Sequence, residues 1–386
     1  MERPAATAFT GARIFDGESW HDDAALTVTA DGRIHGIRPS HALPEAIEHV
    51  RLDGGFLAPG FVDLQVNGGG GVLFNAQPDV DGIAAICRAH ARYGTVALLP
   101  TLITDRPDVT RRALDAGRAA AEAGVPGFLG LHIEGPHLSI ARKGVHDPSL
   151  IRPMEESDFA ALAAAARHLP VLMTTLAPET VPPAEIRRLA EAGVLVSLGH
   201  SDAGAALARE AAEAGARLVT HLYNAMSPLA HREPGMVGNA LDHGPLDVGL
   251  IADGFHVDPV AIRVALRSKR GPGRIFLVTD AMSTIGTDLT SFTLNGRTIH
   301  RAGGRLTLAD GTLAGADIDM LASIVFLHRQ VGVPLEEALR MASLYPAEAV
   351  GQGDALGSIK PGARASLVHL TSDLELKGVW IDGRPA

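Results

Sequence analysis

Two histidines stand at the ends of two short apolar runs, and their spacing suggests that they act together. His200 ends V-L-V-S-L-G-H and His221 ends A-R-L-V-T-H, while the alanine-rich residues between them read as a helix. In a parallel strand–helix–strand unit both strands point the same way, so residues after their carboxyl ends lie side by side. Imidazole is the commonest protein ligand for metal ions, so the pair is half of a candidate metal site. A histidine at such a position can instead cap a strand, and the pair therefore needs a third ligand.

Further polar residues follow other apolar runs of the chain at equivalent positions. Glu134 closes the run in L-H-I-E-G-P-H, and Asp280 closes the run in V-T-D-A. Polar residues in the same place after several apolar runs are difficult to explain by packing, but they are expected on the catalytic rim of a parallel barrel. The other members of this set are Asp63, Gln65, Asn67, Asp253 and His256.

The residue types of this set predict hydrolytic chemistry at a metal ion. Glu134, His200 and His221 supply one carboxylate and two imidazoles, which suits Zn²⁺ with one position left open, although Fe²⁺, Co²⁺ or Mn²⁺ also accept these ligands. A bound divalent ion lowers the pKa of a water ligand from about 16 to about 7. Asp280 is then the natural group to take a proton from this water and to deliver it to a leaving group.

The elements that must position these residues appear as apolar runs alternating with amphipathic segments. Eight apolar runs joined by helices, each run buried on both faces, predict an α/β fold, a (β/α)8 TIM-type barrel. Residues 227–247 are rich in Pro, Gly and His and are predicted to form a long loop. The expected strands are residues 61–66, 95–102, 127–133, 171–176, 194–198, 217–220, 248–251 and 275–279, and the expected helices are residues 81–92, 107–123, 155–168, 183–192, 203–214, 259–269, 317–331 and 334–344.

Both ends of the chain read differently, as short strands and turns. Residues 7–58 carry a hairpin signal at Asp31-Gly32, and the last 37 or so residues again alternate strand and turn patterns. We expect residues 1–58 and 350–386 to build one small β-sandwich domain, and residues 59–349 to form the barrel. Alternating residues with N-G and D-G turns predict a β-hairpin insertion in the barrel near residues 291–315.

The composition limits the possible partners and compartments. A formal charge of −10 over 386 residues argues against nucleic acid or an acidic membrane surface as the main partner. Cys87 is the only cysteine, so neither an intrachain disulfide nor a thiolate metal cluster is possible. The first 25 or so residues lack a signal-peptide pattern, and no apolar stretch approaches the roughly 18 residues of a membrane span, so we expect a cytoplasmic protein.

Nine segments in register resemble the N-acetylglucosamine-6-phosphate deacetylase family of the amidohydrolase superfamily. They are A-P-G-F-V-D-L-Q-V-N-G, L-H-I-E-G-P-H, R-K-G-V-H, L-G-H-S-D, T-H-L-Y-N-A-M, D-G-F-H, V-T-D-A, T-L-A-G and G-S-I-K-P-G-A. The resemblance implies hydrolysis of the acetamide of N-acetylglucosamine 6-phosphate to glucosamine 6-phosphate and acetate, in amino-sugar catabolism and cell-wall sugar recycling. It also implies metal ligation by Glu134, His200 and His221, catalysis by Asp280, and a His256 that holds the substrate and polarises its carbonyl.

The same resemblance implies a set of substrate contacts and a dimer. Arg232 matches an arginine that reaches the sugar phosphate bound in the neighbouring subunit, so a homodimer is expected. A guanidinium and backbone amides are suitable groups for a phosphate, and the loop of Arg232 is otherwise poor in cations. The matching substrate-contacting residues are Val145, His146, Asn224, Ala225, Asp253, Gly254, Phe255, His256, Leu313, Ala314 and Gly315.

Three departures from the family pattern matter. The common first-strand H-x-H is Gln65-Val66-Asn67 here, which predicts a single ion with the amides of Gln65 and Asn67 behind its ligands. His137 stands where the family usually has a bulky aromatic residue, and it offers a possible extra ligand. Ala316 replaces a serine that commonly follows T-L-A-G, which affects the implied contacts at that edge.

Two alternatives to this function remain open from the sequence. Another amidohydrolase, acting on an unphosphorylated or cyclic amide, would share the metal site and Asp280 but would not need Arg232. A scaffold that has lost its chemistry should lack a ligand or the aspartate, whereas all four positions are filled here.

Overall fold

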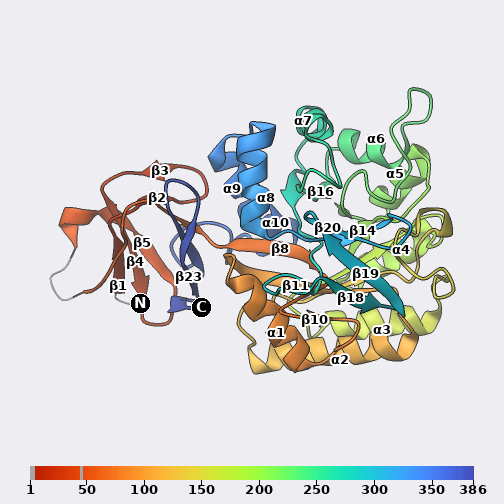
Figure 1. The fold of residues 1–386 in the computed structure, drawn as a ribbon, viewed down its shortest axis with the longest axis horizontal. Helices are drawn as coiled ribbons and strands as arrows, with labels where there is room; N and C mark the ends of the chain where they lie inside the picture. The colour runs from red at the N-terminus through yellow and green to blue at the C-terminus, as the bar shows by residue number, and fades with distance from the viewer. Residues whose placement is uncertain (1–4, 44–46) are drawn as a thin grey trace.

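The computed structural model describes residues 5–43 and 47–386, and its centre is a parallel eight-stranded sheet rolled into a barrel (Figure 1). The strands follow one another in chain order around the sheet, each pairing in parallel with the next. The predicted barrel is therefore confirmed. Its strands are β8 (Phe61–Val66), β11 (Thr95–Ile103), β12 (Leu131–Glu134), β13 (Leu172–Leu176), β14 (Leu195–Leu198), β15 (Leu218–Val219), β16 (Asp247–Leu250) and β17 (Ile275–Leu277).

The seam between the first and the last strand is closed by the segment that follows β17. Val66 bridges Ala281 in parallel, and Asp280 N donates to Gln65 O at 2.9 Å. Before this bridge in the chain, hydrogen bonds to the side chain of Asp63 replace backbone pairing between the first and the last strand. Fully buried Asp63 accepts hydrogen bonds from Thr279 Oγ1 at 2.6 Å and from Thr279 N at 3.2 Å. The last strand is thus attached to the first through the residues that lead directly into Asp280.

Asp63 is expected to make the stability of the fold depend on pH. Burial raises the pKa of Asp63 to about 7, although three donated hydrogen bonds act in the opposite direction. Because this value lies above the unfolded pKa of about 3.9, the folded state binds the proton more tightly, and the free energy of unfolding decreases as pH rises through this window. The decrease is at most about 1.4 kcal/mol per pH unit.

Asp63→Asn removes this dependence while the other acids remain in both proteins. The unfolding free energy of the wild type minus that of the variant should therefore decrease between about pH 4 and about pH 8 in denaturant titrations. A difference that stays constant over this range would mean that Asp63 is ionised in the folded protein.

Helices between the strands cover the outside of the barrel, and local sequence explains several of their ends. Asp79 accepts from Gly82 N at the start of the first helix, and Asp319 accepts from Ala322 N at the start of the eighth. The helices are α1 (Val80–Ala91), α2 (Pro107–Ala123), α3 (Glu156–Ala166), α4 (Pro183–Glu191), α5 (Ala205–Glu213), α6 (Gly235–Asp242), α7 (Pro259–Ser268), α8 (Met320–Phe326) continuing as a π-helix (Leu327–Val331), α9 (Leu335–Ala342) and α10 (Leu344–Ala349). No helix in the described part of the chain has the length and apolar character that crossing a membrane requires.

Two helices differ from the sequence prediction. The predicted loop 227–247 contains α6, whose residues are buried on nearly every side, so they lack the apolar periodicity of a surface helix. Ser227 Oγ accepts from Met236 N at 2.7 Å and helps to start this helix. The short α10 follows α9 directly and carries Pro346 in its first turn, where proline is tolerated.

Strands from both chain ends form two sheets beside the barrel, and both termini lie in this part of the molecule (Figure 1). The sheets share a core that includes Phe9, Ile14, Leu26, Leu57 and Leu367. The division into domains at residues 58 and 350 stays a prediction. One sheet has the order β5 (Ile34–Pro39), β4 (Ala24–Thr29), β1 (Ala5–Thr10) and β6 (Glu48–Arg51); the other has the order β24 (Arg384–Pro385), β23 (Leu376–Ile381), β22 (Leu367–Leu370), β7 (Phe56–Pro59), β2 (Arg13–Phe15) and β3 (Trp20–His21).

The insertion after β17 is larger than the predicted hairpin. It is a four-stranded antiparallel meander of β18 (Ser291–Leu294), β19 (Arg297–Ala302), β20 (Arg305–Thr307) and β21 (Leu313–Ala316). Its apolar residues Leu294, Ile299 and Leu306 pack with Val145 and Leu73, the latter in the small hairpin of β9 (Gly68–Gly69) and β10 (Val72–Leu73). The meander therefore covers loops at the carboxyl end of the barrel.

Candidate active site

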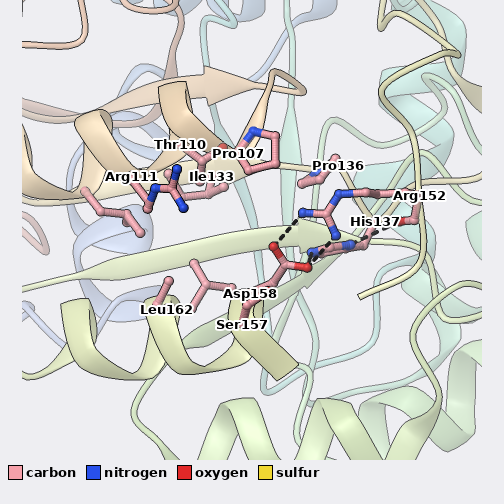
Figure 2. Close-up of a pocket in the computed structure, with 13 residues that line it drawn as sticks. Pro107, Thr110, Arg111, Ile133, Pro136, His137, Arg152, Ser157, Asp158 and Leu162 are labelled. Carbon is pink, nitrogen blue, oxygen red and sulfur yellow. Dashed lines mark hydrogen bonds and ion pairs between the residues drawn. The ribbon is translucent and has the colours of Figure 1, made fainter. Parts of the chain in front are cut away.

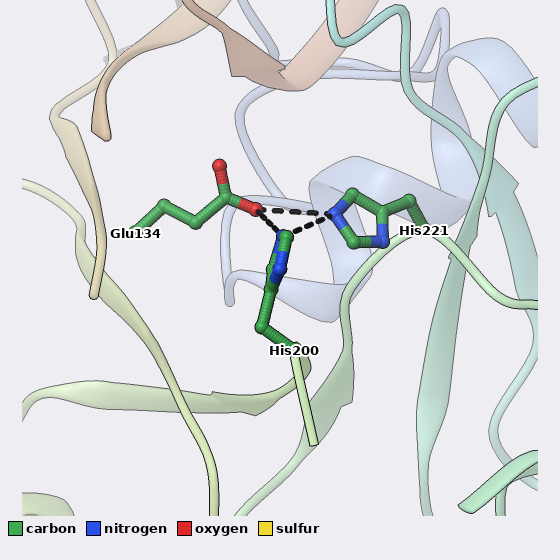
Figure 3. Close-up of side chains that lie close together, drawn as sticks. All are labelled: Glu134, His200 and His221. Carbon is green, nitrogen blue, oxygen red and sulfur yellow. Dashed lines mark hydrogen bonds and ion pairs between the residues drawn. The ribbon is translucent and has the colours of Figure 1, made fainter. Parts of the chain in front are cut away.

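Three ligand atoms converge at the carboxyl end of the barrel. Glu134 is the last residue of β12, while His200 and His221 stand two residues after β14 and β15. Glu134 Oε1 lies 3.1 Å from His221 Nε2 and 3.3 Å from His200 Nε2, and the two Nε2 atoms are 3.2 Å apart. Figure 3 shows the three side chains pointing toward one point. All three are buried.

The geometry of this cluster suits a divalent cation. His200 Nδ1 donates to Arg142 O at 2.9 Å, so its Nε2 carries a lone pair that faces the carboxylate and the second imidazole. Two nitrogens at about 2.0–2.1 Å from a tetrahedral ion lie about 3.3 Å apart, close to the observed separation. Burial opposes the ionisation of Glu134, but the two imidazoles hold its pKa well below the ordinary value. The cluster is therefore an anionic site whose donor atoms fit one metal ion.

Backbone strain is concentrated at the same rim. His200, His221 and Asp280 have φ values of 49°, 28° and 53°, in the left-handed region that non-glycine residues rarely adopt. Such conformations cost about 1–3 kcal/mol each and persist where the surrounding structure imposes them. Here each lies a few residues after a strand, where a sharp turn of the chain directs the side chain into the mouth of the barrel.

Two amides, one in β8 and one directly after it, connect the cluster to Asp280. Gln65 Nε2 donates to Glu134 Oε1 at 3.0 Å and to Asp280 Oδ1 at 3.2 Å. Asn67 Nδ2 donates to the same Asp280 Oδ1 at 2.7 Å. Both amides therefore engage one oxygen of Asp280 and leave Oδ2 without a partner among the described residues. Gln65 thus contacts the ligand Glu134, whereas Asn67 contacts Asp280 and, among the described residues, none of the three ligands.

The electrostatics of Asp280 fit a group that exchanges protons near neutral pH. Burial, and then the negative charge of Glu134, raise the pKa of Asp280 to about 6. At pH 7 the carboxylate is mostly ionised, yet its conjugate acid is accessible. His146, by contrast, is kept neutral because burial lowers its pKa to about 3. Its Nδ1 shares a hydrogen bond of 2.8 Å with Thr104 Oγ1.

A cavity of about 220 Å³ opens above these groups. The three predicted metal ligands, Asp280 and His256 line this cavity, and most predicted substrate contacts line it as well. Gly315 has a φ of 66°, and a Cβ there would lie 2.9 Å from Asp280 O, so the T-L-A-G wall requires glycine. The predicted residues in the lining are Asn67, Glu134, Val145, His146, His200, His221, Asn224, Ala225, His256, Asp280, Leu313 and Gly315; the sequence did not single out Ile103, Gly144, Ile251, Met282 or Thr312.

Other predicted substrate residues lie outside this lining. Ala314 is fully buried behind it, and Phe255 is 40% exposed, with the Arg305 guanidinium 4.4 Å above its ring. Arg232 lies in the exposed stretch 228–234, where nothing in the same subunit engages its side chain among the described residues. Within its own subunit, Arg232 therefore does not line the cavity above the ligand cluster.

His137 is not a further member of the ligand cluster. Its Nδ1 donates to Arg152 O at 3.1 Å, and its Nε2 lies 3.8 Å from Asp158 Oδ2. Asp158 in turn accepts a hydrogen bond of 2.6 Å from Arg152 Nη2 (Figure 2). His137 thus ties the loop after β12 to the start of α3, and the suggestion of an extra metal ligand is wrong for this residue. Sequence spacing could not show this because the side chain turns away from the rim.

Comparison with known proteins places this site in a family. The model described as "Amidohydrolase family" matches residues 56–386, and that described as "NagA composite domain" matches residues 7–57. The chain belongs to the amidohydrolase family. It is 40% identical to an N-acetylgalactosamine-6-phosphate deacetylase of Shewanella sp. (strain ANA-3), over 97% of this chain and 94% of the relative. It is 37% identical to an N-acetylglucosamine-6-phosphate deacetylase of Haemophilus influenzae, over 91% and 92%.

Solved amidohydrolase structures share the fold. An N-acetylglucosamine-6-phosphate deacetylase from Pasteurella multocida has a TM-score of 0.95 at 37% identity, covering 98% of this chain and 99% of that chain. A mutant of the Mycobacterium smegmatis enzyme, in complex with N-acetyl-D-glucosamine-6-phosphate, has a TM-score of 0.90 at 32% identity and covers 99% of both chains. The sequence resemblance to the deacetylase branch of the amidohydrolases is thereby confirmed, and the chain is a hydrolase of this branch.

Proposed function

We propose that this amidohydrolase removes the acetyl group from N-acetylglucosamine 6-phosphate, giving glucosamine 6-phosphate and acetate. The observation that carries the proposal is the convergence of Glu134, His200 and His221 beside Asp280, at the base of a cavity lined by the predicted sugar contacts. The 40% identical relative that acts on the galactosamine epimer makes N-acetylgalactosamine 6-phosphate the second candidate substrate. We assign the reaction to amino-sugar catabolism and cell-wall sugar recycling in the cytoplasm.

One divalent ion per subunit is proposed at the three ligand atoms, with zinc as the first choice and iron, cobalt or manganese as alternatives. When bound, such an ion supplies Lewis acidity, polarising a carbonyl oxygen and making a water acidic at neutral pH. Gln65 holds Glu134 Oε1 from behind, and Arg142 O fixes the tautomer of His200. These contacts orient the ligands before any ion arrives.

Asp280 carries the proton through the reaction. Its Oδ2 takes a proton from the attacking water as the water oxygen bonds to the acetamide carbon. The same oxygen then gives the proton to the sugar nitrogen as the carbon–nitrogen bond breaks, leaving an amine and acetic acid, which ionises to acetate. This assignment to Oδ2 is supported by the two amides that occupy Oδ1. His256, which lines the cavity, is proposed to direct Nε2 at the carbonyl oxygen.

The phosphate of the substrate requires a partner subunit. No lysine or arginine lines the cavity in the described part of the chain, and Ala225 N makes no hydrogen bond among the described residues. We propose that this amide and Arg232 of the partner subunit bind the phosphate in a homodimer. Large apolar side chains exposed in rim loops and on α7 support such an interface: Ile140, Leu229, Phe255, Val260, Val264 and Leu289.

Acetate release from the 6-phosphate sugar and from plain N-acetylglucosamine tests the function and the phosphate site together. Arg232→Ala should raise KM for the phosphorylated sugar about tenfold to a hundredfold, the value of one charge-assisted contact, and should leave plain-sugar turnover unchanged. Arg209→Ala removes another exposed arginine, which pairs only with Asp242 at the surface, and serves as the matched control. Equal activity of the wild type on both sugars would favour the alternative amidohydrolase acting on an unphosphorylated amide.

Mixed dimers separate a contact made in trans from one made within a subunit. When Arg232→Ala and Asp280→Asn subunits are combined, only one kind of site has both an intact Asp280 and an intact partner arginine. Random mixing should therefore restore about a quarter of the wild-type sites. If no activity returned on mixing, the arginine would act within its own subunit or not at all.

A further inference from the structure

The carboxylate of Asp253 accepts three hydrogen bonds from its own turn. Asp253 Oδ1 accepts hydrogen bonds from Phe255 N and His256 N, both at 2.8 Å. Asp253 Oδ2 accepts one from His256 Nδ1 at 2.6 Å. The side chain is 4% exposed and does not line the substrate cavity. A sugar hydroxyl therefore has no direct access to this carboxylate.

The turn that holds Asp253 is itself fixed from two sides. Gly254 has a φ of 76°, and a Cβ there would lie 2.9 Å from the ring of Phe326 on α8. On the other side, Arg305 of the meander covers the ring of Phe255. The Asp253–His256 pair is thus held in one geometry before substrate binds.

This geometry determines where His256 carries its proton. A carboxylate can only accept, so the hydrogen bond to Asp253 requires a proton on His256 Nδ1. We propose, as a consequence that rests on the function above, that Asp253 is a positioning residue that fixes the Nδ1–H form of His256 and so presents Nε2 to the acetamide. Nε2 then donates a hydrogen bond to the carbonyl oxygen only when the ring carries both protons.

Two carboxylates interact with the His256 ring. Asp253 faces the ring from the same turn, and Asp280 faces it from the segment after β17, where the charge of His256 in turn lowers the pKa of Asp280. Burial raises the pKa of Asp253, but the hydrogen bond and charge of His256 hold it below its ordinary value. A ring that carries a second proton on Nε2 can donate to the carbonyl oxygen where negative charge develops, and Asp253 accepts from Nδ1 in that state as well.

Asp253→Asn reverses the hydrogen bond with little change of shape. The asparagine oxygen can still accept from Phe255 N and His256 N, but its amide group now donates to His256 Nδ1, which moves the ring proton to Nε2. Nitrogen NMR of protein labelled in the histidine rings should show a protonated Nδ1 in the wild type and an unprotonated Nδ1 in the variant. Comparison with His256→Gln identifies the signals of His256.

Kinetics of the metal-loaded protein provide the second readout. Asp253→Asn should lower kcat about tenfold to a hundredfold, because the ring loses the carboxylate that accepts from its Nδ1, and should change KM by less than about threefold. Asp258→Asn is the matched control. It makes the same charge change five residues further on, where the side chain only caps α7, and asparagine caps equally well.

The outcomes are distinct. A moved ring proton together with a loss in kcat supports the proposal. An unchanged His256 signal, or a variant whose loss is in KM alone, overturns it, because Asp253 would then act on the sugar or on the fold. The NMR measurement needs no substrate, so it remains decisive even if the wild type releases no acetate from a phosphorylated sugar, a result that would reject the proposed function instead.

Discussion

Asp280→Asn lowers kcat by about a hundredfold to ten-thousandfold and leaves the metal content unchanged, because it removes the proton carrier without touching a ligand. The asparagine fills the same space, and its oxygen can still accept from Gln65 and Asn67 at the position of Oδ1. What it lacks is a second oxygen that binds a proton. The loss should therefore fall on kcat, with little change in KM.

Metal content by mass spectrometry and acetate release, measured on the same preparations, check this result. Asp258→Asn is again a suitable control, since it removes a nearby carboxylate that only caps a helix. Turnover at the wild-type rate in metal-loaded Asp280→Asn would exclude Asp280 from the chemistry and leave the raised pKa of this residue without a role.

His200→Ala should abolish both metal binding and turnover. It deletes one of three converging ligand atoms and leaves Arg142 O without its buried donor. A ligand that binds only the folded state stabilises it, so a chelator should lower the melting temperature of the wild type and have no effect on the variant. This comparison reports on the ion independently of catalysis.

Two other histidine variants make the metal measurement specific. His168→Ala changes an exposed residue, and His137→Gln changes a buried one that faces Asp158 instead of the cluster. Both should keep about one ion per subunit, as the single Glu-His-His ligand set allows. Retention of the ion by His200→Ala, or its loss in His137→Gln, would contradict the proposed ligand set.

The barrel and its rim could be predicted because they depend on local pattern. Strands buried on both faces leave long apolar runs, and a polar residue after such a run is conspicuous whichever tertiary contacts it makes. Glu134, His200, His221 and Asp280 all carry this signal, and the structure brings them to one rim. The pairing of Gln65 and Asn67 with Asp280 was not predicted, although the first and last strands meet in a closed barrel.

The remaining features depend on contacts that no local pattern records. Helix α6 is buried on nearly every side, so the period of its exposed face is absent. His137 was a candidate ligand by position, yet its ring is turned outward by partners that lie about 15 to 21 residues away in the chain. The family resemblance implied a sugar contact for Asp253, and only the three-dimensional turn shows that its oxygens accept from Phe255 N and His256 Nδ1.

The three ligand residues stand at the end of β12 and just after β14 and β15, strands joined by an uninterrupted ladder through β13. The acid and its two amides belong instead to the junction of the first and last strands. We therefore expect ion binding to depend on the ladder from β12 to β15, and turnover to depend in addition on the junction of the first and last strands. We expect catalytic activity to require closure of the barrel. Heating that opens the junction of the first and last strands should therefore abolish activity while the ion stays bound.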